Sequence, residues 1–102
     1  MKEYDWQIRV VELAKLCGWR HAHFRPLHTT KGWRTPQSGD AGFPDLVLVH
    51  PAKKRVIFAE LKVDSPVRPD QKEWLKALGS VQGVETYLWR PPDWDAVLDI
   101  LR

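Results

Sequence analysis

Two acidic residues and a lysine lie in the apolar middle of the chain with a spacing that favours chemistry on phosphodiesters. Asp45 directly precedes the apolar run at residues 46–49, and Glu60 and Lys62 stand two apart in a second run rich in Val, Ile and Phe. Side chains alternate along a strand, so Glu60 and Lys62 should share one face while Leu61 points to the other. A hairpin of the two runs would bring Asp45 across from Glu60.

Two carboxylates in such an apolar setting repel each other and resist ionisation unless a cation joins them. Their oxygens suit Mg²⁺, which keeps part of its water shell and bridges to a phosphate. Lys62 would add a positive charge that contacts the scissile phosphate or orients the attacking water. The pattern predicts phosphodiester hydrolysis by a metal-activated water.

The alternative is an ordinary salt bridge on an edge strand, between Glu60 and Lys62 or a nearby acid, which is common and contributes little to stability. Phe58 and Ala59, which precede them, favour a central strand instead.

Elements that would position these residues follow from the periodicity of the sequence. Apolar residues at helical spacing predict a first helix over residues 3–17, which Gly18 ends. Alternation predicts a strand at residues 19–25. Residues 27–42, rich in Thr, Gly, Pro and Ser, are expected to form a loop, and a loop of this length is either functional or mobile.

The second half of the chain predicts the rest of a mixed α/β fold. Residues 45–49 and 55–63 read as strands that pair antiparallel through a turn at 51–54. Pro69 suits the first turn of a second helix, which ends at Gly83. A strand at 84–89 and a short helix capped by Asp93 follow. This order predicts a mixed sheet with helices packed against it.

The length of 102 residues predicts a single domain, residues 1–102, with no second core. The net charge of +3 favours anionic partners, and the distribution of charge adds to this, because no acid occurs between Arg20 and Gly39. This basic segment is either a solvated loop or a strip that contacts phosphates.

Within the second interpretation, Arg25, Lys31 and Arg34 would contact the phosphates of a nucleic acid. Trp33 would stack on an unpaired base, cover a dimer contact or pack locally. Arg68, just ahead of the second helix, is a further expected contact to a nucleic acid.

Several classes of protein are disfavoured by composition. Cys17 is the only cysteine, which excludes a disulfide framework and a cysteine zinc site. His21 and His23 have no zinc-site spacing and are expected to be solvent-side residues or phosphate contacts. No run approaches transmembrane length and the N-terminus lacks an apolar signal region, so a cytoplasmic protein is expected.

Longer motifs around these residues resemble the VRR-NUC family, the virus-type replication-repair branch of the PD-(D/E)xK nucleases. The likeness is to its compact, stand-alone, phage-like members and covers nearly the whole chain. It rests on residues 42–49 (GFPDLVLV), 58–62 (FAELK), Gln71 with Trp74 and Leu75, and residues 87–91 (YLWRP). The resemblance implies a restriction-endonuclease-like core, dependence on Mg²⁺ or Mn²⁺, and DNA as substrate. For the phage-like members it further implies homodimers that act on four-way (Holliday) junctions.

Residue by residue, the resemblance makes Asp45 and Glu60 metal-binding carboxylates and Lys62 the catalytic lysine. The carbonyl of Leu61 would also reach the metal. Gln71 matches a family glutamine near the active site, with an ordinary helix-surface amide as the alternative.

An acid from the first helix is also implied. Glu3 matches it by its distance from Gly18 and its spacing to Gln7, which lies on the same helix face. The alternative for Glu3 is an acid favoured by the helix dipole. Glu12 competes for the role but fits the solvent side of the helix better.

Three other functions stay open at this stage: a monomeric nuclease of flaps or single strands, a catalytically silent DNA-binding accessory protein, and a basic adaptor for a protein partner. The presence of Asp45, Glu60 and Lys62 together favours the enzyme.

Overall fold

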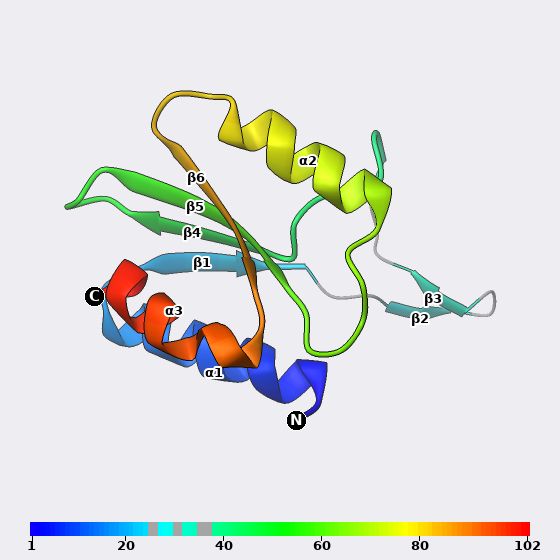
Figure 1. Cartoon of the computed structure of the whole chain (residues 1–102), viewed down its shortest axis with the longest axis horizontal. Helices are drawn as coiled ribbons and strands as arrows, with labels where there is room; N and C mark the ends of the chain where they lie inside the picture. The colour runs from blue at the N-terminus through cyan, green and yellow to red at the C-terminus, as the bar shows by residue number, and fades with distance from the viewer. Residues whose placement is uncertain (25–26, 30–31, 35–37) are drawn as a thin grey trace.

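The structure, a computed structural model, describes residues 1–24, 27–29, 32–34 and 38–102, and of 27–29 and 32–34 only the backbone. Its elements in chain order are α1 (Glu3–Leu16), β1 (Arg20–His23), β2 (Leu27–Thr29), β3 (Gly32–Arg34), β4 (Leu46–His50), β5 (Arg55–Leu61), α2 (Pro69–Gly79), β6 (Val84–Trp89), the 3₁₀ turn η1 (Pro91–Asp93) and α3 (Trp94–Leu101). Four strands form one sheet in the order β1-β4-β5-β6, with α1 and α3 on one face and α2 on the other (Figure 1). The predicted mixed α/β fold is confirmed.

The two central strands carry the predicted hairpin. β4 and β5 run antiparallel, with Leu46 opposite Ala59 and Leu48 opposite Ile57. β5 and β6 run parallel, and α2 is the crossover that a parallel pair requires. β5 therefore lies inside the sheet, and the edge-strand interpretation of Glu60 and Lys62 is wrong.

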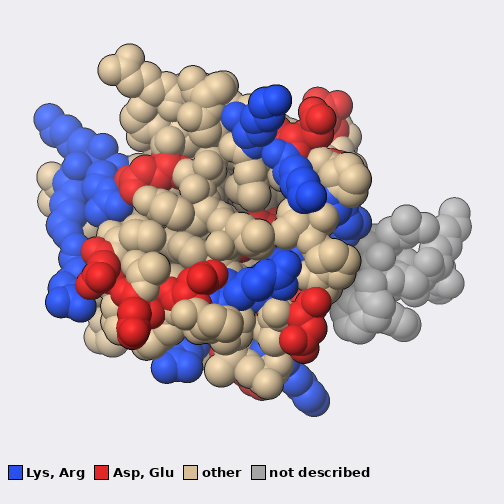
Figure 2. Space-filling view, viewed as in Figure 1, with Lys and Arg blue, Asp and Glu red and all other residues tan. Residues whose placement is uncertain are grey.

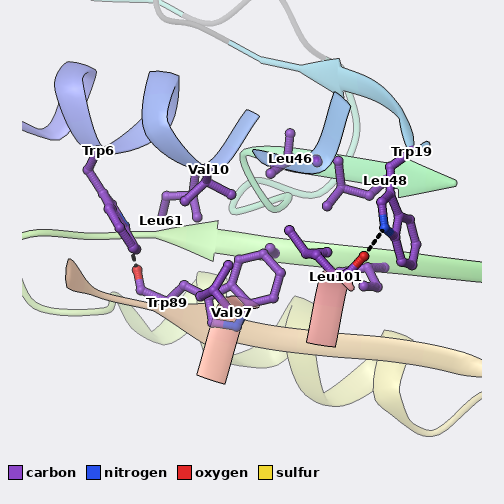
Figure 3. Close-up of a cluster of buried hydrophobic side chains, with 12 residues drawn as sticks. Trp6, Val10, Trp19, Leu46, Leu48, Leu61, Trp89, Val97 and Leu101 are labelled. Carbon is purple, nitrogen blue, oxygen red and sulfur yellow. Dashed lines mark hydrogen bonds between the residues drawn. The ribbon is translucent and has the colours of Figure 1, made fainter. Parts of the chain in front are cut away.

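One face of the sheet holds the hydrophobic core. Alternate residues of the central strands meet the apolar stripe of α1 and one side of α3, and the buried set is Trp6, Val10, Ala14, Trp19, Leu46, Leu48, Ile57, Ala59, Leu61, Trp89, Val97 and Leu101. A buried indole needs an acceptor for its N–H. Trp6 Nε1 donates to the carbonyl of Trp89 at 3.0 Å, and Trp19 Nε1 to that of Leu101 at 2.9 Å (Figure 3). These bonds fix α1 to β6 and the start of β1 to α3.

The opposite face carries a smaller aromatic cluster of Phe24, Phe43, Phe58 and Trp74. The ring of Phe43 meets each of the other three edge to face, with centroid distances of 5.0–5.9 Å. This geometry is favourable for aromatic pairs. The cluster joins α2 to the segment that leads into β4.

Two sequence predictions need correction. The expected loop at residues 27–42 contains a second, two-stranded sheet of β2 and β3, which lies to one side of the main sheet (Figure 1). The turn residues around Gly32 were read as loop, although Leu27, Thr29 and Trp33 favour strands.

The second helix ends at Gly79, four residues before the predicted Gly83. Ser80 ends it, because its Oγ donates to the carbonyl of Ala77 at 2.7 Å and its N–H to that of Lys76. Val81, which the helical pattern placed on the packed face, is 54% exposed.

In the described part of the chain, no helix has the length and apolarity needed to cross a membrane.

Gly42 marks a close approach between the segment that precedes β4 and the start of α2. Its φ is +97°, and a Cβ built there would lie 2.6 Å from the backbone carbon of Asp70. The indole of Trp74 supports the same contact, because Nε1 donates to the carbonyl of Asp40 at 3.1 Å. Only glycine combines this φ with this spacing.

We expect Gly42→Ala to lower the free energy of unfolding by about 1–3 kcal/mol more than Gly39→Ala. Gly39 is a matched control, because its φ is +94° but an added Cβ would meet nothing within 4 Å. Urea unfolding measures both. Equal losses in the two variants would show that only the backbone angle matters and that the contact with Asp70 does not.

Candidate active site

The three predicted residues come together on the α2 side of the sheet. Asp45 immediately precedes β4, Glu60 lies in β5, and Lys62 follows β5 by one residue. Glu60 is 1% exposed and Lys62 7%, which is unusual for charged side chains. Leu61 points the other way into the core, as strand alternation requires.

Asp45 is fixed to the partner strand through the backbone. Its Oδ2 accepts the N–H of Leu61 at 3.1 Å. This hydrogen bond extends the β4–β5 pairing by one step and places the Asp45 carboxylate beside that of Glu60.

The two oxygens of Glu60 have different surroundings. Oε2 accepts from Nε2 of Gln71 at 2.9 Å and lies 3.5 Å from Nζ of Lys62. Oε1 is buried and has no hydrogen-bond partner. Burial, and then repulsion from Asp45, raise the pKa of Glu60 to about 8, while the Lys62 ammonium opposes this shift.

Gln71 is a buried part of the site rather than a surface amide, with 6% exposure. Its Oε1 accepts the N–H of Arg68 at 3.0 Å, as the glutamine of a capping box does. With Oε1 engaged there, the amide must present Nε2 to Glu60. The first turn of α2 therefore orients the carboxylate of β5.

Oxygen donors in this cluster fit a hard divalent cation. Two carboxylates lie side by side, one with an unsatisfied buried oxygen, and such groups suit Mg²⁺ or Mn²⁺. Within residues 1–24 and 38–102, no three acidic, His or Cys side chains are grouped closely enough to hold a metal. Glu3, half-buried in the first turn of α1, is thus not brought together with Asp45 and Glu60, and neither is Glu12.

Predicted DNA contacts are only partly placed. Arg68 is exposed at the start of α2, and its Nε lies 3.3 Å from Oδ1 of Asp70. Arg25 and Lys31 lie outside the described residues, and Trp33 and Arg34 belong to β3, whose side chains are not described. On the face in Figure 2, Lys and Arg side chains form separate groups among acids, so no continuous basic strip marks a DNA path there.

Arg90 is a site-supporting residue to which sequence reasoning gave no role. Its Nη1 donates to the carbonyls of Val63 at 3.1 Å and Ser65 at 3.0 Å, which holds the segment that follows Lys62. Its position in the YLWRP motif is the one feature of the sequence that could have indicated this role. The backbone N–H of Lys62 is held as well, because it donates to the carbonyl of Trp89 at 3.1 Å.

Comparison with known proteins shows the family and the fold of the chain. The family model described as "VRR-NUC domain" matches residues 7–90. A solved structure titled "VRR_NUC domain protein" aligns with a TM-score of 0.61 and 21% sequence identity, covering 99% of this chain and 85% of that one. At this identity the structural likeness bears on the fold. No match was found among curated proteins.

The raised pKa of Glu60 predicts an unusual dependence of stability on pH. In chelator, the free energy of unfolding should fall as pH rises from about 5 through 8, because the folded chain holds a proton that the unfolded carboxyl, with its ordinary value of 4.5, has released. Glu60→Gln should remove this fall, since the amide stays neutral. Urea unfolding across this range measures the effect.

Glu85→Gln is the control for this measurement. Arg55 lowers the pKa of Glu85, so the stabilisation from that carboxylate is lost as pH falls and not as it rises. The alkaline fall should therefore survive in Glu85→Gln. An unchanged fall in Glu60→Gln would contradict the assignment.

Proposed function

Because the chain belongs to the VRR-NUC family of nucleases, we propose that it is a metal-dependent DNA endonuclease with Asp45, Glu60 and Lys62 at its active site. The observation that carries the proposal is the pairing of the half-buried Asp45 with the buried Glu60, in which Oε1 of Glu60 has no partner and a buried lysine stands 3.5 Å from Oε2. A pair of this kind has no evident structural use, since burying it costs free energy.

Asp45, Glu60 and the carbonyl of Leu61 are the groups that would hold Mg²⁺, or Mn²⁺ in its place. When bound, the ion would supply Lewis-acid activation of water and phosphate. Glu3 has no part in this proposal, because it is not grouped with the other two acids.

Gln71 and Lys62 prepare the site in different ways. Gln71 holds Oε2 of Glu60 at 2.9 Å and so leaves Oε1 available as a ligand. Lys62 presents an ammonium on the same face of the sheet, where it can neutralise charge that develops on the phosphate. Gln71 is thus a positioning residue, and Lys62 is the group that would contact substrate.

We further propose that the active form is a two-fold homodimer that prefers four-way junctions. A junction is roughly two-fold symmetric, so an isologous dimer would present one site to each of two opposed strands. Phe24, 43% exposed beside Asp45, and Val49, 38% exposed further along β4, offer apolar surface on the α2 side of the sheet for such a contact. Tryptophan content does not support a dimer, because all five tryptophans with described side chains pack within the chain.

Asp45→Asn, Glu60→Gln and Lys62→Ala should each lower the cleavage rate by roughly 100-fold or more while DNA affinity in Ca²⁺ stays near that of the unmodified chain. The reason is that each removes a charge at the reacting phosphate and little of the binding surface. Single-turnover cleavage and fluorescence anisotropy measure the two quantities.

Lys72→Ala is the control for Lys62→Ala, because Lys72 is an exposed lysine of α2.

Cleavage should require Mg²⁺ or Mn²⁺ and should not occur in Ca²⁺, whose larger and looser coordination suits in-line attack poorly. Full activity in excess chelator would refute the metal site. Full activity of Lys62→Ala would refute the role of Lys62.

Assembly is tested by light scattering and cleavage at one protein concentration, on four-way junctions, flaps, single strands and duplex. We expect a dimer that cuts junctions fastest, and Val49→Asp should reduce both dimer content and junction cleavage without abolishing flap cleavage. A monomer that cuts flaps better than junctions would overturn the assembly proposal and leave the catalytic assignment intact.

A further inference from the structure

A groove of about 350 Å³ lies between α1 and the edge strand β1, on the face of the sheet opposite to the three catalytic side chains. Its lining residues are Gln7, Ile8, Val11, Glu12 and Lys15 from α1, and His21 and His23 from β1. Its volume falls within the range of small-ligand sites. Nothing in the proposed cleavage mechanism uses it.

Both walls of the groove reach the catalytic end of the sheet. On the β1 side, His23 is followed by Phe24, whose N–H donates to the carbonyl of Asp45 at 2.9 Å. On the α1 side, Gln7 follows Trp6, whose indole shares the carbonyl of Trp89 with the backbone N–H of Lys62. A strand that leaves the active site around the end of β1 would therefore meet the groove at Gln7 and His23.

The chemistry of the lining fits unpaired nucleotides better than duplex. His21 and His23 lie on the same side of β1, opposite Leu48 and Leu46, and imidazole rings are among the groups on which unstacked bases pack. Ile8 and Val11 supply apolar surface for base faces, and Lys15 is an exposed cation that can contact the backbone. Gln7 and Glu12 can hydrogen-bond base edges.

We propose that this groove binds a single-stranded segment of the nucleic-acid substrate as it leaves the active site, with His21 and His23 stacking on its bases and Lys15 contacting its backbone. The proposal rests on the endonuclease function inferred above. It makes nucleotides that are unpaired at the branch point, rather than the duplex arms, the part of the substrate that this groove recognises.

Binding separates this proposal from catalysis. Anisotropy would be measured in Ca²⁺ with a labelled dT₁₂ single strand and with a labelled 12-base-pair duplex. His21→Ala should weaken binding of the single strand by about fivefold or more and leave duplex binding unchanged. His21→Phe, which keeps a ring, should recover most of the loss. Lys15→Ala should reduce the salt slope for the single strand by about 0.7.

Lys54→Ala and Lys76→Ala are charge-matched controls on exposed positions outside the groove. Losses confined to His21→Ala and Lys15→Ala, and to the single strand, would support the proposal. Unchanged single-strand affinity, equal losses on duplex, or equal losses in the control variants would each overturn it. If the unmodified chain binds dT₁₂ through the groove but cuts no DNA in Mg²⁺, the proposed function fails and the binding site stands.

Discussion

Burial of the Glu60 carboxylate in a central strand is the constraint on which the rest of the site depends. A carboxyl group at 1% exposure costs several kcal/mol to ionise unless neighbours compensate its charge. Gln71 and Lys62 each approach Oε2, and α2 must begin where it does for Gln71 to reach. That position in turn brings Asp70 against the backbone at Gly42 and Trp74 against Asp40. The segment that carries Asp45 is therefore placed by the same helix that holds Oε2 of Glu60.

The sequence predicted the parts of this arrangement that follow from local pattern. Strand alternation put Glu60 and Lys62 on one face and Leu61 on the other, and the two apolar runs with a short turn predicted the β4–β5 hairpin. Both are confirmed, because period-two burial and turn chemistry act over a few residues. The match to a VRR-NUC motif added Gln71, whose burial no local pattern indicates.

Contacts between segments far apart in the chain were beyond such reasoning. From the sequence, Gly42 is an ordinary loop glycine, and only the fold shows that Asp70 lies against it. The hydrogen bonds from Arg90 to the carbonyls of Val63 and Ser65 likewise join residues more than twenty positions apart. The end of α2 was misplaced because Val81 continues the helical period, while the hydrogen bonds at Ser80 decide where the helix stops. The implied role of Glu3 rested on spacing within one helix, which does not fix where that helix docks.

One face of the sheet carries the hydrophobic core and the other carries the candidate active site. The backbone carbonyl of Trp89 makes hydrogen bonds to both. Stability comes chiefly from the α1 and α3 side, where the apolar core and the buried indoles lie. The α2 side instead buries charged groups, which costs free energy. The carbonyl of Trp89 accepts from Trp6 Nε1 and also from the backbone N–H of Lys62. Docking of the first helix and placement of the lysine are thus coupled through one acceptor. A change in the docking of α1 would therefore reach the site through the backbone of Lys62.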